Sequence, residues 1–205
     1  MRPLTGPRIA LRPLRAGDWE AWREIRLRNH DWLERWEPRP EPGAPDAAAD
    51  REAFRARCGA MERQRHFDTA YSFGVFLRSG GRLIGEVSLG SVQRGAFQSA
   101  YLGYWIDEEY AGQGYIPESV VVLLRHGFED LRLHRIQASI VPHNAPSRRV
   151  AEKLGLRDEG VAVGYLQIQG EWLDHIRYAI TADEWQERSE ALVAAYASKR
   201  ATPTA

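Results

Sequence analysis

Gly112 and Gly114 lie between an apolar run and a helix-like run, in the segment GYWIDEEYAGQGYIPES that spans 103–119. A glycine-rich turn that leads into a helix leaves backbone N–H groups unpaired at the positive end of the helix dipole. Such donors form an anion site suited to phosphate, because glycine accepts a positive φ and lets a phosphate oxygen approach the backbone closely. Pro117 fits the first helical turn, where its missing N–H is not needed.

The loop matches neither of the common nucleotide-binding motifs. It lacks the lysine and hydroxyl of G-x-x-x-x-G-K-[ST], and it is not a G-x-G-x-x-G dinucleotide loop. Spacing alone is therefore equally compatible with an ordinary turn.

A second polar pair, Asn144 and Ser147, follows the apolar run 135–141 and Pro142. A spacing of three residues puts both side chains near the same helix end. By themselves, Asn144 is typical of a helix N-cap and Ser147 of an ordinary first-turn residue.

Hydrophobic periodicity and turn residues indicate the elements that must position these groups. The predicted order is strand 8–14, helix 18–29, helix 47–65, strands 71–77, 82–90 and 97–106, helix 115–130, strand 135–141, helix 144–155, strands 156–169 and 171–180, and helix 181–197. The connection from 97–106 through 115–130 to 135–141 is a parallel crossover. Prolines at 38, 40, 42 and 45 indicate a stiff loop over 31–46 without regular structure. We expect one mixed α/β domain over 1–197 and a disordered tail over 198–205.

Composition narrows the class of protein. The 205 residues contain 28 Lys+Arg and 28 Asp+Glu, so no global positive charge favours nucleic-acid binding. Cys58 is the single cysteine, and no apolar run approaches the length of about 20 residues that a membrane span needs. We therefore expect a cytoplasmic protein without nucleic-acid or membrane contacts, either a monomer or a weak homodimer.

The order of elements and motifs resembles the GNAT acetyltransferases, and most closely their ribosomal-protein-alanine N-acetyltransferase (RimJ-type) subfamily. The matching segments are WLERWEP (32–38), VQRGAFQSAYLGYWI (92–106), YAGQGYIPES (110–119), LHRIQASIVPHN (133–144), AEKLGL (151–156) and YLQIQGEWLDH (165–175). The resemblance implies the GNAT fold, with a mixed central sheet of about seven strands flanked by helices and an extra C-terminal helix.

The resemblance also implies acetyl-CoA as cosubstrate and no metal. Its pyrophosphate would lie on the loop amides, and its pantetheine arm on the strand before the loop. The implied cofactor-binding residues are Trp105, Ile106, Gly112, Gln113, Gly114, Tyr115, Ile116, Asn144 and Ser147. Glu109 departs from the Gln or Arg that the family has at this position, so its carboxylate is expected to point away from the pyrophosphate.

Acetyl transfer needs a neutral amine and a proton for the leaving thiolate. In the resemblance, Ser147 donates to the sulfur and Asn144 orders the cofactor. Glu86, a carboxylate in an apolar strand, is a candidate base, although an outward-facing strand position explains it equally well. Glu171 and Tyr165 are further candidates.

An α-amino group has a pKa of about 7.7–8.0, against about 10.4 for lysine, so ordered water could replace a dedicated base for an N-terminal amine.

The predicted acceptor-binding residues are Trp36, Glu86, Tyr104 and Tyr165. Trp32 and Trp36 are both expected on the acceptor rim; the alternative, a place in the hydrophobic core, fits Trp32 better than Trp36. The resemblance implies the N-terminal alanine of a small-subunit ribosomal protein as acceptor. A small-molecule amine acetyltransferase and a non-catalytic module that binds coenzyme A or a ribosome-assembly partner are the alternatives. The six histidines show no metal-ligand spacing, and Cys58 is expected in the core.

Overall fold

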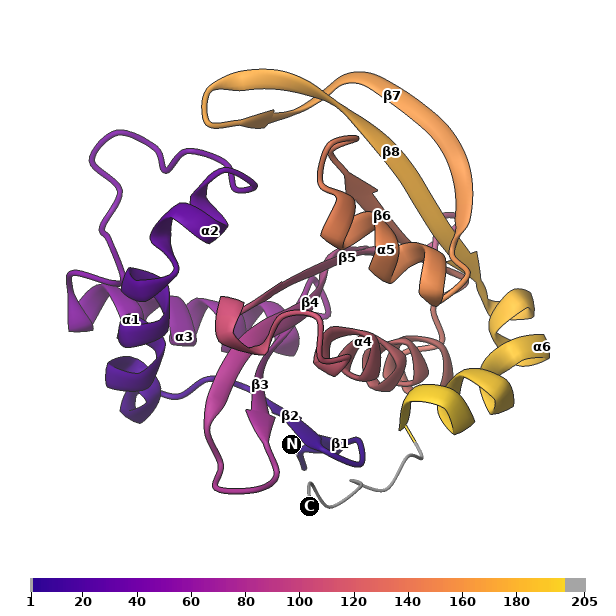
Figure 1. Cartoon of the computed structure of the whole chain (residues 1–205), viewed down its shortest axis with the longest axis horizontal. Coiled ribbons are helices and arrows are strands. Elements are labelled where there is room, and N and C mark those ends of the chain that lie inside the picture. The colour runs from indigo at the N-terminus through magenta and orange to yellow at the C-terminus, as the bar shows by residue number, and fades with distance from the viewer. Residues whose placement is uncertain (1, 198–205) are drawn as a thin grey trace.

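A mixed sheet of eight strands forms the centre of residues 2–197, the part of the chain that this computed structural model describes (Figure 1). The strands are β1 (Leu4–Thr5), β2 (Ile9–Arg12), β3 (Tyr71–Leu77), β4 (Leu83–Gln93), β5 (Ser99–Ile106), β6 (Arg135–Ile140), β7 (Arg157–Ile168) and β8 (Glu171–Thr181). The α-helices are α1 (Trp19–Arg28), α2 (His30–Glu34), α3 (Arg51–His66), α4 (Tyr115–Arg125), α5 (Ala145–Lys153) and α6 (Ala182–Leu192). Short 3₁₀-helices cover Ala16–Asp18 and Glu108–Tyr110, and π-helical turns cover His126–Asp130 and Val193–Ala197. The predicted tail over 198–205 lies outside the described residues.

The strand order is β1-β2-β3-β4-β5-β6-β8-β7, and β5 and β6 are the parallel pair within it. This pair confirms the predicted crossover through α4. The β7–β8 hairpin turns at Gln169 and Gly170, whose φ angles of 52° and 92° suit a two-residue turn. It arches over the molecule, and its turn approaches α2 (Figure 1).

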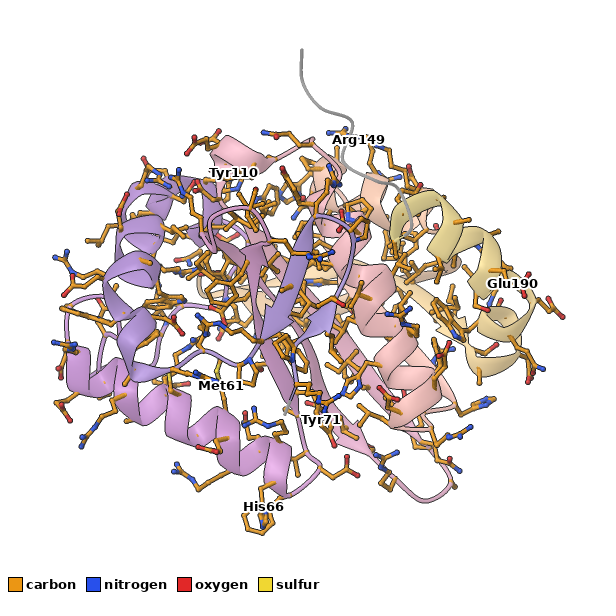
Figure 2. The ribbon with its side chains drawn as sticks, turned by 90° about the horizontal axis from the view of Figure 1, so that it is seen from below. Met61, His66, Tyr71, Tyr110, Arg149 and Glu190 are labelled. Atoms are coloured by element: carbon orange, nitrogen blue, oxygen red, sulfur yellow. The ribbon has the colours of Figure 1, made fainter. Side chains whose placement is uncertain are left out.

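Helices cover both faces of the sheet and form two apolar clusters. Trp22 of α1 and Phe54 of α3 pack on one face with Phe76 and Leu83. On the opposite face, residues 116–124 of α4 are all buried, so this helix is covered on more sides than a single apolar stripe predicts. Seen from below, α1 and α3 lie at one side of the ribbon and α6 at the other (Figure 2).

Local signals account for most element ends. The Thr181 hydroxyl and the Glu184 carboxylate form the predicted capping box at the start of α6. The predicted irregular loop over 31–46 is wrong at its start, since α2 occupies residues 30–34. Its first proline, Pro38, lies beyond that helix and therefore does not interrupt it. No helix within residues 2–197 is long and apolar enough to cross a membrane.

Candidate active site

The loop between β5 and α4 has the backbone conformation that the glycines predict. Gly112 and Gly114 have φ angles of 74° and 82°, and Gly114 is the N-cap residue of α4. A Cβ added to Gly112 would meet no protein atom within 4 Å, so the space beside it is open. Gly114, Tyr115 and Ile116 all line the adjoining cleft. The first-turn amides of α4 therefore border an open cradle.

Beside this loop, β5 and β6 diverge. They pair only over residues 99–101, although β5 continues to Ile106. Within the described residues, no strand pairs with 102–106 on that side. The indole N–H of Trp32 donates to the Ile106 carbonyl at 3.2 Å, which occupies one of the exposed backbone acceptors. The other backbone groups on this side of 102–106 have no strand partner in the described part of the chain, so an extended polar chain can pair with them.

The backbone N–H and C=O groups of successive residues in β5 point alternately to the two sides of the strand, which decides which of them face the gap. The Asp107 N–H donates to Ile84 O on β4 at 2.8 Å, so the backbone groups of Trp105, two residues earlier, also face β4. Those of Tyr104 and Ile106 face the gap. The prediction of Trp105 as a backbone partner is therefore replaced by Tyr104, whereas Ile106 keeps its predicted place.

A cleft of about 480 Å³ runs along this gap to the glycine loop at Gly112 and Gly114. Most of the predicted site residues line it: Trp36, Glu86, Tyr104, Trp105, Ile106, Gly112, Gly114, Tyr115, Ile116, Asn144 and Ser147. Tyr110 and Arg149, which line it from opposite walls, lie at the same edge of the ribbon in Figure 2. Chain segments that are far apart in sequence therefore meet in one cleft.

Three predicted residues lie outside the cleft wall. The Tyr165 hydroxyl lies 3.0 Å from that of Tyr101, and Glu171 is exposed at the start of β8. Gln113 directs its side-chain amide to the Glu109 carbonyl at 2.8 Å. The Glu109 carboxylate lies 3.3 Å from Arg82 and is also absent from the cleft wall, which confirms that it points away from the loop.

Asn144 and Ser147 occupy the first turn of α5. Asn144 is the N-cap residue, and its Oδ1 accepts from the Ser147 N–H at 3.2 Å. Capping uses the amide oxygen of Asn144 but leaves the Ser147 hydroxyl for other partners.

The hydroxyl partner of Ser147 is Tyr104. The two side-chain oxygens are 2.8 Å apart, and the Tyr104 hydroxyl also donates to the Ser147 carbonyl at 3.2 Å. Burial, only partly offset by the hydrogen bond to Ser147, raises the pKa of Tyr104 to about 12. The phenol therefore keeps its proton at neutral pH and joins β5 to α5 across the gap.

Glu86 faces the cleft rather than the solvent, so the outward-facing alternative is wrong. It is 6% exposed and lies directly opposite Trp105. Its carboxylate accepts from the Trp22 indole at 2.7 Å and from Arg57 at 2.8 and 3.0 Å. These donors fix a carboxylate at the cleft wall, where it can accept a hydrogen bond from an amine.

Trp32 and Trp36, the two tryptophans predicted on the acceptor rim, are both half-buried and both line the cleft. The ring of Trp36 lies 5.2 Å from that of His143. The hairpin turn reaches the same wall, since the Gln169 amide donates to the carbonyls of Glu34 and Glu37 at 2.9 and 3.1 Å. The turn thus packs against the segment that carries Trp36.

Sequence reasoning missed a buried network behind the loop. Asp107 is 1% exposed and accepts from Asn29 at 2.9 Å and from Arg28 at 2.5 Å. It ties the end of α1 to the end of β5. A carboxylate directly after an apolar strand was the available signal, but its partners lie nearly 80 residues earlier in the chain.

Within the described part of the chain, no three His, Cys, Asp or Glu side chains are grouped so that they could hold a metal ion. His66 points away from the end of α3 (Figure 2). Cys58 is half-buried beside the cluster on α1 and α3 rather than within it, and burial raises the pKa of its thiol.

Comparison with known proteins agrees with this geometry. Residues 8–157 match the family model of the acetyltransferase (GNAT) domain. The chain is 37% identical over 177 residues to the probable N-acetyltransferase YjcK of Bacillus subtilis, covering 86% of this chain and 96% of that protein. It is 32% identical to the [ribosomal protein uS5]-alanine N-acetyltransferase of Escherichia coli, covering 89% and 92%. The structure of Mycobacterium smegmatis RimJ in complex with CoA-disulfide superposes with a TM-score of 0.84 at 33% identity, covering 95% and 92%.

Proposed function

Because the chain belongs to the GNAT family and is an acetyl-CoA-dependent N-acetyltransferase, we propose that its acceptor is the N-terminal amine of a protein. The finer proposal is the N-terminal alanine of a small-subunit ribosomal protein. The names of the Escherichia coli relative and of the Mycobacterium smegmatis neighbour support it. Such an acceptor would place the reaction in the cytoplasm.

The observation that carries this proposal is a row of small residues on the cleft floor. Ser72, Ser88 and Gly103 are directly opposite one another on three adjacent strands, and all three line the cleft. The Ser88 hydroxyl lies only 3.1 Å from the position that a Cβ on Gly103 would take, so even a methyl group at Gly103 would crowd the serine. Glu86, two residues before Ser88, supplies the adjacent carboxylate. The small floor residues leave room beside the Glu86 carboxylate for an acceptor amine and the first side chain of a peptide.

The rest of the cleft suits the cosubstrate. The unpaired edge at Tyr104 and Ile106 can pair with the amides of a pantetheine arm, and the open cradle at Gly112 has room for a pyrophosphate. Bound acetyl-CoA supplies the acetyl thioester that an amine attacks. These residues of the chain bind and orient it.

The proposed proton transfers use groups on the two sides of the gap. Glu86 accepts a hydrogen bond from the incoming amine, whose low pKa leaves part of it neutral near pH 7. As the C–N bond forms the amine gives its proton to Glu86; as the C–S bond breaks the Ser147 hydroxyl donates its proton to the sulfur, and water carries the proton from Glu86 back to the serine oxygen. When the Tyr104 hydroxyl donates to Ser147 Oγ in place of the Ser147 carbonyl, the serine proton is left free to face the cleft.

Exchange of Tyr104 for phenylalanine tests this arrangement. We expect kcat to fall about 5- to 10-fold and the KM for acetyl-CoA to stay unchanged, because one positioning hydrogen bond of about 1 kcal/mol is lost. In a Ser147→Ala background the same exchange should have no further effect. Tyr101→Phe is the matched control, since it removes a phenol on the same strand that pairs with Tyr165. An equal loss of kcat in the wild-type and Ser147→Ala backgrounds would contradict the proposal that Tyr104 acts through Ser147.

Thiol release with a panel of acceptors tests the function. Peptides that begin with Ala or Ser should react faster than peptides that begin with Phe, and faster than polyamines or aminoglycosides. The same peptides with an acetylated N-terminus and an internal lysine should be inert. Faster turnover of a small amine would overturn the peptide proposal. Tight binding of coenzyme A without turnover of any acceptor would instead identify a non-catalytic module.

A further inference from the structure

Arg8 lies against the phosphate loop from the side away from the cleft. Its Nη1 donates to the Gln113 carbonyl at 3.0 Å, and its Cζ lies 4.4 Å from the centre of the Tyr115 ring. Its Nη2 is 3.4 Å from the position that a Cβ on Gly114 would take. Gly114 and Tyr115 line the cleft, whereas Arg8 does not. The guanidinium therefore contacts the loop without bordering the cleft.

A buried carboxylate fixes this guanidinium. Glu118, in the first turn of α4, is fully buried and accepts from Arg8 Nε at 2.7 Å. The same carboxylate accepts from the backbone N–H groups of Arg8 at 2.7 Å and Ile9 at 3.1 Å. Three donors at one carboxylate join the start of β2 to the start of α4. Arg8 accordingly has little freedom to leave the loop.

The hydrogen bond from Arg8 to the Gln113 carbonyl determines the direction of the Gly114 N–H group. The C=O of Gln113 and the N–H of Gly114 belong to one planar trans peptide, so they point in opposite directions. Arg8 draws the carbonyl outward, and the Gly114 N–H is thereby directed toward the cleft. A rotated peptide would instead present a carbonyl oxygen, the negative end of the dipole, to an anion. With a positive φ of 82° at Gly114, rotation is sterically open, so a restraint is needed.

We propose that Arg8 is a positioning residue for the pyrophosphate of coenzyme A. It acts through the Gln113 carbonyl and does not touch the ligand. Its charge is balanced by Glu118, so its contribution is the orientation of one amide donor rather than a free positive charge.

The test compares a cosubstrate that has the pyrophosphate with one that lacks it. Arg8→Lys keeps a cation for Glu118 but loses the fork that reaches both Glu118 and Gln113. The double variant Arg8→Gln/Glu118→Gln removes both charges together, so that neither is left buried alone. Arg78→Gln is the matched control, since Arg78 donates to the carbonyls of Gly6 and Pro7 beside the same strand but not to the loop. Calorimetry gives the Kd for coenzyme A, and thiol release gives kcat/KM for acetyl-pantetheine.

We expect the Kd for coenzyme A to rise about 10-fold or more in both Arg8 variants, the size of one lost charge-assisted hydrogen bond. The kcat/KM for acetyl-pantetheine should stay within about twofold of the wild-type value, because that molecule has no pyrophosphate. Arg78→Gln should change neither quantity. Unchanged coenzyme A affinity in the folded variants would overturn the proposal. An equal loss with acetyl-pantetheine would do the same, since it would indicate a general structural effect.

Discussion

Replacing Ser147 with alanine should lower kcat about 100-fold, the usual size of a lost general-acid contribution. The hydroxyl is within hydrogen-bond distance of Tyr104 and borders the cleft, so its removal takes away the proposed donor to the sulfur. The backbone N–H of Ser147, which caps to Asn144, is unaffected by this change. Helix α5 and the affinity for coenzyme A should therefore be preserved. Steady-state thiol release and calorimetry measure the two quantities.

Ser189→Ala in α6 is the control for a serine-to-alanine exchange in a helix away from the cleft. It should leave kcat unchanged. A wild-type kcat in the Ser147 variant would remove this residue as the acid. A parallel loss of coenzyme A affinity would mean that Ser147 binds the cosubstrate rather than donating a proton to it.

Replacing Gly112 with valine should raise the Kd for coenzyme A by more than about 100-fold, because the side chain would fill the cradle where several amide–phosphate hydrogen bonds form. Valine also strains a backbone with a φ of 74°, at a cost of about 1–3 kcal/mol. The effect of this backbone strain must therefore be separated from the effect of the valine side chain on coenzyme A binding.

Gly80 offers that separation. It has a φ of 81°, an added Cβ there would also meet no atom within 4 Å, and it lies in the β3–β4 turn outside the cleft wall. Gly80→Val should therefore destabilise the fold by a similar amount, as thermal unfolding would measure, and leave coenzyme A binding intact. Comparable affinity in the two variants would contradict the cradle assignment.

Local signals in the sequence determined the elements and the loop. A glycine pair between a strand and a helix predicts the left-handed turn, since its steric preference does not depend on the rest of the chain. The capping box at Thr181 and Glu184 and the hairpin turn at Gly170 involve neighbours only and are confirmed. The order of elements predicts the parallel crossover, and the crossover brings the glycine loop and the Asn144–Ser147 turn to the same end of the sheet.

Side-chain direction is less accessible from sequence where both faces of a strand are covered. Glu86 has apolar neighbours in β4, and only the positions of Trp22 and Arg57 decide that it faces the cleft. Tyr165 on the final hairpin is a predicted acceptor-binding residue, yet its hydroxyl lies 3.0 Å from that of Tyr101 and outside the cleft wall.

The sequence alone thus determined the loop, the helix caps and the order of strands, because each depends on interactions between near neighbours. The tertiary structure decided where β5 and β6 separate and which backbone groups are left open. It also decided that Tyr104 meets Ser147 and that Arg8 meets Gln113, 105 residues away. These contacts follow from packing between distant elements, whose ion pairs and hydrogen bonds leave no periodic signal in the chain.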